Sequence, residues 1–172
     1  EAARKLGFTT QRTMRTAQQL YEGVDIGQGA VGLITYMRTD SVNLAQEAIT
    51  ELREYIGERY GNDQVPDQPR RFKTKAKNAQ EAHEAIRPTS VQQRPDDIKE
   101  HLSREQFRLY ELIWKRTVAS QMNHATIDTV SADLAAGEQG VFRATGSTIA
   151  KPGFMAVYLE GRDDNAGNDD EK

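Results

Sequence analysis

The sequence predicts an α+β fold that is mainly helical, and three of its features lead to this expectation. Apolar residues recur at helical spacing over much of the range 1–122. A short apolar run at Leu33–Arg38 is strand-like instead, and from residue 123 on β-prone segments alternate with glycine-containing turns. We therefore expect a helical domain over 1–122 that contains one short strand, a partial β-rich region over 123–162, and an acidic flexible tail or loop over 163–172.

The N-terminal residues predict two helices that are broken at Gly7, with Thr9 or Thr10 as the N-cap of the second. Two helices joined by a glycine turn also occur in helix-turn-helix motifs, although most such pairs serve only to pack. The second helix has a predicted apolar stripe of four residues: Met14, Ala17, Leu20 and Tyr21.

Residues 27–32 match the pattern GxGxxG. The dinucleotide-binding fingerprint requires a strand before its glycines and a helix after them. Here the predicted order is the reverse, because a helix precedes the glycines and a strand follows them. We therefore exclude nucleotide binding at this segment.

A longer helix is predicted after the strand, with Ser41 or Asn43 as its N-cap. It should reach about Tyr60 and end at Gly61. Its expected buried stripe consists of Ala45, Ile49, Leu52 and Ile56.

A short helix is predicted at Ala79–Ile86 and ends before Pro88. Ser103 and Gln106 then form a capping box for a long helix that extends to about Met122. The core side of this helix is expected to carry Phe107, Tyr110, Trp114 and Val118. Beyond it, strands are expected over 125–134, 140–145 and 154–159.

Composition excludes several classes of protein. Apolar residues make up 37% of the chain, and no stretch approaches the ~20 apolar residues of a membrane span. Zero cysteines exclude disulfides and thiolate metal sites, and favour a cytoplasmic location. The first residues are not a signal peptide, and a start without Met in helical sequence predicts a fragment of a longer polypeptide.

The net charge of −3 is unevenly distributed. The segment 163–172 holds five acids and one base, so the remainder has 21 acids and 22 bases out of the 26 and 23 in the whole chain. The run 70–77 carries five bases and no acid. Such a run either follows a phosphate backbone or forms a solvated surface loop, and the sequence leaves both open.

The strand-like run is the first candidate for chemistry. Tyr36, Arg38 and Asp40 stand at alternate positions and share one face of an extended segment, with Thr35 and Thr39 on the other. A phenol is only roughly 0.1% ionised at pH 7, so a nucleophilic tyrosine needs a nearby positive charge or base. The guanidinium fits phosphate oxygens, and the carboxylate is suited to orient it or to transfer a proton. Spacing alone favours a tyrosine that merely packs.

The second candidate is the segment 80–89, which contains His83 and Glu84. It begins like a zinc-protease helix, but Arg87 stands four positions after His83, so no metal-binding pair forms. The imidazole is suited to donate to a phosphate or to relay a proton. A polar surface histidine is the alternative. The sequence has no Walker A motif, so it offers no phosphate-binding loop for ATP.

Three blocks together, at 6–22, 32–41 and 80–89, resemble the type IA DNA topoisomerases, and the bacterial topoisomerase I type in particular. The resemblance implies that Tyr36 attacks a phosphodiester of single-stranded DNA and forms a 5′-phosphotyrosyl link. Strand passage and religation then relax negative supercoils without ATP. It also implies that Arg38 contacts the scissile phosphate and that His83 acts near it. Substrate-binding roles are expected for Thr35, Thr39, Asp40, Glu84 and Arg87.

The resemblance further implies partners outside this sequence. Mg²⁺ is expected in the full-length enzyme on an N-terminal toprim domain that nothing here matches, and we expect no metal site in this fragment. The β-rich region resembles part of the arch that supports the tyrosine domain. The expected partners are thus single-stranded DNA and the toprim and arch domains of the same polypeptide, in the bacterial cytoplasm at the nucleoid, with no membrane. The isolated fragment should be inactive.

Three alternatives remain open from the sequence. The chain is either a non-catalytic helical module that binds nucleic acid, the equivalent domain of a topoisomerase III or reverse gyrase, or an interaction domain with no role on DNA.

Overall fold

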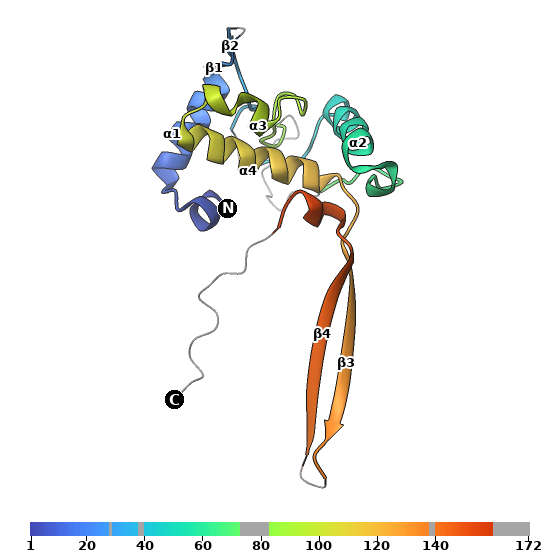
Figure 1. The fold of residues 1–172 in the computed structure, drawn as a ribbon. Coiled ribbons are helices and arrows are strands. Elements are labelled where there is room, and N and C mark those ends of the chain that lie inside the picture. The colour runs from blue at the N-terminus through green and yellow to red at the C-terminus, as the bar shows by residue number, and fades with distance from the viewer. Residues whose placement is uncertain (28, 38–39, 73–82, 138–139, 160–172) are drawn as a thin grey trace.

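The computed structural model describes residues 1–27, 29–37, 40–72, 83–137 and 140–159. A helical body is built around α4, and a long two-stranded ribbon projects from it (Figure 1). Helix exceeds strand in the described residues, so the predicted mixture of the two is confirmed.

The N-terminal helices form as expected. A single π-helical turn (Ala2–Leu6) ends at Gly7, whose φ of 68° is left-handed, and α1 (Thr10–Glu22) follows. The Thr9 hydroxyl caps α1 by accepting from the Arg12 N–H at 3.2 Å. The predicted apolar stripe is only half correct. Ala17 and Leu20 are buried, whereas Met14 and Tyr21 are exposed. Met14 lines a cavity together with Met37, and the Tyr21 ring contacts the ring of Tyr36.

The glycine-rich segment is a small hairpin of β1 (Val24–Asp25) and β2 (Ala30–Val31), paired antiparallel. The Asp25 carboxylate accepts from the N–H groups of Gly27 and Gly29 at 2.9 and 3.2 Å. The glycines therefore serve a turn whose polar groups are satisfied locally.

Helix α2 (Gln46–Tyr60) begins later than predicted. Its N-cap is Ala45, so the expected caps Ser41 and Asn43 are wrong; the Ser41 hydroxyl instead accepts from the Asn43 N–H at 3.2 Å. The end at Gly61 is confirmed. The buried side of α2 consists of Ala48, Ile49, Leu52, Tyr55 and Ile56.

Short helical turns, α3 (Pro95–Ile98) and a 3₁₀ turn (Lys99–His101), lead to α4 (Arg104–Ser120). The predicted capping box is present, with Ser103 and Gln106 bonded to each other's backbone N–H groups. Helix α4 packs against α1. Its core side chains are anchored by polar groups: the Trp114 indole donates to the Val91 carbonyl at 3.0 Å and the Tyr110 hydroxyl to the Gln93 carbonyl at 2.7 Å.

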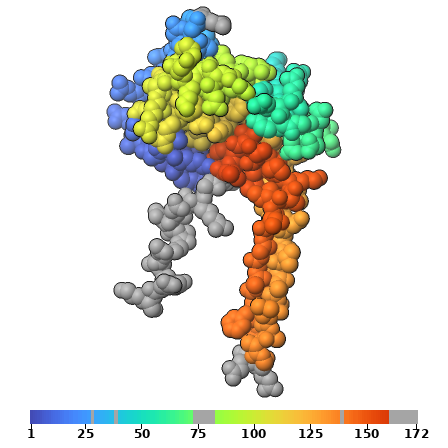
Figure 2. All heavy atoms as spheres, viewed as in Figure 1, coloured from blue at the N-terminus to red at the C-terminus, as the bar shows by residue number. Residues whose placement is uncertain are grey.

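The ribbon consists of β3 (Thr126–Ala135) and β4 (Val141–Lys151), antiparallel and exposed along their described length (Figure 2). The third predicted strand, 154–159, is wrong, because a 3₁₀ turn (Gly153–Ala156) takes part of its place. The chain turns back at Gly153 (φ 50°), where a Cβ would clash with the carbonyls of Asn123 and His124. Within the described residues, no helix combines the length and apolar character that a membrane crossing requires.

Candidate active site around Tyr36

The segment that carries Tyr36 is extended and fixed to residues 85–89. The Thr35 N–H donates to the Arg87 carbonyl at 2.9 Å, and the Thr89 N–H donates to the Leu33 carbonyl at 3.1 Å. Only one β-bridge forms, between Ile34 and Pro88, so the predicted strand at 33–38 is not a regular strand in its described part. The ladder does not continue, because the Leu33 N–H donates to the Leu20 carbonyl at 2.8 Å and the Arg87 N–H donates to the Thr35 hydroxyl at 3.0 Å.

The side chain of Tyr36 is exposed, although its apolar neighbours in the sequence are buried. Leu33, Ile34 and Met37 are buried, whereas the Tyr36 side chain is 57% exposed. The Tyr36 ring lies edge-on to the Tyr21 ring of α1, with centroids 5.3 Å apart. Its phenol is thus presented to solvent by a backbone that the core holds in place.

Thr35, expected to contact substrate, uses its hydroxyl inside the protein. The hydroxyl donates to the Ala85 carbonyl at 2.8 Å and accepts from the Arg87 N–H at 3.0 Å. Together with the backbone bond described above, these contacts join the residue before Tyr36 to the loop at 85–87.

Asp40 and His83 come together from the two sequence motifs. The His83 Nδ1 lies 3.4 Å from an Asp40 carboxylate oxygen, and the two side chains are 22% and 30% exposed. They form an ion pair when the imidazole is protonated. The predicted short helix is wrong for 83–86, which is irregular, and its residues 79–82 lie outside the described residues. Backbone groups here bond across to other segments, as when the Ala85 N–H donates to the Asn43 carbonyl at 2.7 Å.

Glu84 and Arg87, also expected to bind substrate, bond to each other. The Arg87 guanidinium donates to both Glu84 oxygens, at 2.6 and 3.2 Å, and to the Pro88 carbonyl at 2.8 Å. Glu84 also accepts from the Ala45 N–H at 2.8 Å and so satisfies the N-cap residue of α2. Burial raises the pKa of Glu84, but the bonds from Arg87 and Ala45 outweigh it and hold this pKa below its ordinary value.

Arg38 and Thr39 lie outside the described residues, as does 73–77 of the basic run. The rest of that run is tied to the body. Buried Gln121 accepts from the Arg70 N–H at 3.2 Å and donates to the Arg70 carbonyl at 3.0 Å. No local sequence pattern predicts this contact, because Arg70 and Gln121 are far apart in the chain.

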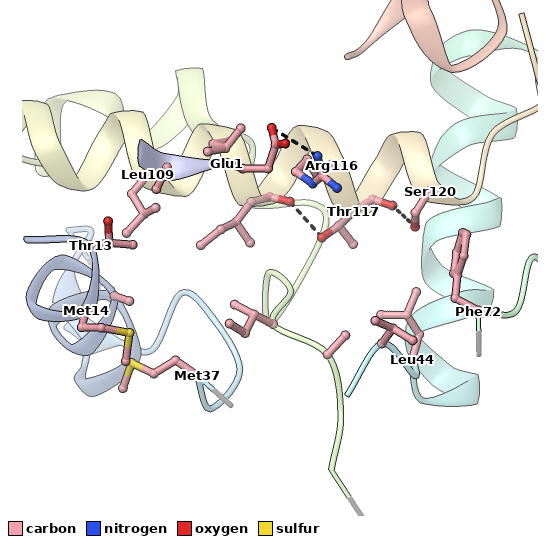
Figure 3. Close-up of a pocket in the computed structure, with 17 residues that line it drawn as sticks. Glu1, Thr13, Met14, Met37, Leu44, Phe72, Leu109, Arg116, Thr117 and Ser120 are labelled. Carbon is pink, nitrogen blue, oxygen red and sulfur yellow. Dashed lines mark hydrogen bonds and ion pairs between the residues drawn. The ribbon is translucent and has the colours of Figure 1, made fainter. Parts of the chain in front are cut away.

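An apolar cavity of about 690 Å³ lies beside the tyrosine segment, between α1 and α4 (Figure 3). Met14 and Met37 lie toward each other at one end of it, and Leu44 and Phe72 lie at the other. Arg116 at its margin pairs with Glu1 at 3.3 Å. Since Met37 follows Tyr36 directly, the packing of this cavity bears on the position of the phenol.

As far as the described residues extend, no cluster of three or more His, Asp or Glu side chains is arranged to hold a metal ion. The candidate groups that the structure describes are an exposed phenol on a fixed backbone and a histidine next to a carboxylate.

The comparisons with known proteins agree on one family. The profile of the DNA topoisomerase family matches residues 1–171, and the chain belongs to that family. The resemblance inferred from the three sequence blocks is thus confirmed.

Individual relatives are closely similar. The chain is 60% identical to DNA topoisomerase 1 of Xylella fastidiosa (strain Temecula1 / ATCC 700964), over 99% of this chain and 21% of that protein. It is 55% identical to DNA topoisomerase 1 of Rickettsia bellii (strain RML369-C), over 96% of this chain and 21% of that protein. The structure of full-length topoisomerase I from Thermotoga maritima matches with a TM-score of 0.79 and 38% identity, over 95% of this chain and 26% of that one. The chain thus spans about a fifth of the length of these curated relatives.

Proposed function

We propose that this chain is the tyrosine-bearing part of a type IA DNA topoisomerase and that Tyr36 is its nucleophile. The observation that carries the proposal is the exposed Tyr36 phenol on a segment whose neighbours Ile34 and Met37 are buried. A core tyrosine would hide its ring, and a loop tyrosine would lack the backbone bonds to 85–89. Family membership supplies the reaction class, and the relatives named DNA topoisomerase 1 favour the bacterial topoisomerase I type over topoisomerase III or reverse gyrase.

In this reaction the Tyr36 oxygen forms a bond to phosphorus as the phenol loses its proton. The bond from phosphorus to the 3′ oxygen breaks, and that oxygen leaves with a proton as a 3′ hydroxyl. The 5′-phosphotyrosyl diester keeps much of the free energy of the bond that it replaced. Attack by the 3′ hydroxyl therefore reseals the strand without ATP. Passage of another strand through the break changes the linking number and relaxes negative supercoils.

We assign the charged groups as follows. Arg38 contacts the scissile phosphate and stabilises the charge that develops on its oxygens. His83, held next to Asp40, donates to the phosphate or relays a proton. Thr39 remains our candidate for a contact with the DNA backbone. For Thr35, Glu84 and Arg87 the internal bonds support a positioning role beside any contact with substrate.

The remaining machinery is assigned to the rest of the polypeptide, since the chain spans about a fifth of its relatives. Mg²⁺ on a toprim domain would supply further positive charge at the phosphate. We place the helical catalytic domain at 1–122 and part of an arch at 123–162, with single-stranded DNA as substrate in the bacterial cytoplasm. The ribbon supports the assignment of 123–162 to a larger domain. A two-stranded ribbon that is exposed on both faces is only marginally stable alone, and further strands would stabilise it.

The test is Tyr36→Phe in the full-length enzyme, with Tyr21→Phe as the matched control. Each change removes one hydroxyl from the same edge-to-face pair of rings. We expect Tyr36→Phe to abolish the covalent DNA adduct while DNA affinity is kept, and Tyr21→Phe to retain the adduct. An adduct that persists in Tyr36→Phe would show that another group is the nucleophile. A purely DNA-binding module predicts no adduct in any variant.

A further inference from the structure

A second cavity, of about 690 Å³, lies between the first halves of α1 and α4 and differs sharply from the apolar one. It falls within the usual size range of ligand sites, roughly 300–1,000 Å³. Polar side chains dominate its lining, which consists of Thr9, Gln11, Arg12, Arg15, Thr16, Gln19, Ser103, Arg104 and Glu105. No role in the reaction of Tyr36 has been assigned to any of them.

This cavity faces away from Tyr36. Arg12, Thr16 and Gln19 share one side of α1 because they are spaced by four and three residues. Met14 and Tyr21, seven residues apart, share another side and contact the tyrosine segment. The buried residues Ala17 and Leu20 lie between these two sides of the helix.

The charge of the cavity is strongly positive. Three arginines line it, and Glu105 is the one acidic residue in its described lining. Glu105 pairs with Arg12. Arg15 and Arg104 form no ion pair with any described residue, although Glu105 also attracts Arg15 through space. Neither guanidinium on these neighbouring helices is thus held by a carboxylate, and both can contact an anion.

The side chains that line this cavity favour a phosphate group as the ligand. The planar guanidinium matches two phosphate oxygens at once and stays charged at any physiological pH. Nearby Arg12 and Arg108 stack on the Phe8 ring, at 4.7 and 5.7 Å, so this corner of the body is rich in arginine beyond the lining itself. A polyanion with regularly spaced phosphates fits such a surface better than a single small anion.

We propose that this cavity binds the phosphate backbone of DNA at a point remote from the attacked phosphate. The proposal rests on the proposed function, which makes DNA the polyanion. Arg15, one of the two arginines outside an ion pair, lies six residues before Tyr21, or roughly 9 Å along α1 at about 1.5 Å per residue, and on a different side of the helix. A phosphate held here is therefore not the one that Tyr36 attacks. Because α1 contacts Tyr36 near its other end, the helix fixes the two sites relative to each other.

The test compares Arg15→Gln/Arg104→Gln with the control Arg143→Gln/Lys151→Gln, both in the full-length enzyme. Each double variant removes two positive charges from exposed positions, the control from the ribbon. DNA affinity is measured between about 50 and 200 mM salt on single-stranded and on duplex DNA. Two lost contacts should lower the slope of log K against log salt by about 1.4 on a single strand or about 1.8 on a duplex.

The outcomes are distinct. A lower slope in Arg15→Gln/Arg104→Gln than in the control supports the proposal, and the DNA form that shows it identifies the ligand. Arg15→Lys/Arg104→Lys, which keeps both charges, should retain most of the slope. Equal slopes in the cavity variant and the control on both DNA forms overturn the proposal. Adduct formation by Tyr36 is scored separately, so a failure of the nucleophile assignment leaves the slope comparison intact.

Discussion

Thr35→Val tests whether the bonds beneath Tyr36 matter for its chemistry. Valine keeps the shape of threonine but removes the hydroxyl that joins the tyrosine segment to residues 85–87. The change leaves the Ala85 carbonyl and the Arg87 N–H without their partner at 2.8 and 3.0 Å. The backbone bond from the Thr35 N–H to the Arg87 carbonyl is retained.

The expected cost follows from these two groups. A buried polar group without a partner costs about 1–3 kcal/mol. Both groups are half-buried, so water satisfies them in part, and we take about 1–2 kcal/mol for each. The free energy of unfolding should therefore fall by about 2–4 kcal/mol. A shift of the phenol by about 1 Å reduces the rate of a positioned reaction by about 10²-fold, so adduct formation should slow about 10–100-fold.

Two assays measure these effects. Denaturant unfolding gives the stability of the chain, and the rate of adduct formation on an oligonucleotide is measured in the full-length enzyme. Thr50→Val is the matched control, since the hydroxyl of Thr50 lies on the exposed side of α2 and donates to the Gln46 carbonyl at 3.1 Å. That change should stay within about 0.5 kcal/mol and leave the rate unaltered. If Thr35→Val behaves as Thr50→Val does in both assays, the positioning argument is wrong.

Three further predictions concern the surroundings of the site. The depressed pKa of Glu84 means that its stabilising contribution is present above the ordinary value of 4.5 and is lost as pH falls through the lower folded value. Glu84→Gln should therefore weaken the fall in the free energy of unfolding at acid pH. An unchanged fall would contradict this prediction. Gln121→Leu removes both bonds to the Arg70 backbone and should cost about 2–3 kcal/mol in a denaturant titration, whereas no loss would show that water replaces them. The 172-residue chain alone, supplied with Mg²⁺, should form no covalent adduct, and its detection on a denaturing gel would refute the need for other domains.

The features that local sequence determines were predicted well. Thr9, Gly61 and the capping box of Ser103 and Gln106 act within one helical turn, so a few neighbouring residues decide them. The start of α2 was missed because the N-cap residue bonds to Glu84, which is distant in the chain. No window of sequence around Ala45 contains that partner.

In the candidate site, too, some features follow from local sequence and others depend on residues that are distant in the chain. The three sequence blocks predict functional roles for Tyr36 and His83, which stay predictions, and the structure adds that Asp40 lies next to His83. Periodicity, however, predicted a regular strand and a short helix where the described residues are irregular. The strand does not continue because the Leu33 N–H bonds to the Leu20 carbonyl, and the helix does not form because the Ala85 N–H bonds to the Asn43 carbonyl. Both partners are distant in the sequence, so periodicity could not show them.

The two sequence motifs, at 32–41 and 80–89, therefore also stabilise each other by packing and hydrogen bonding. Thr35 bonds to 85–87, and Glu84 and Arg87 bond to each other and to the start of α2. A long motif in an enzyme is easily interpreted as a long list of substrate contacts. Here much of its length is accounted for by holding a short segment of backbone. Among the described members of the two motifs, the exposed phenol of Tyr36 and the pair of Asp40 and His83 are the groups that we propose for the chemistry.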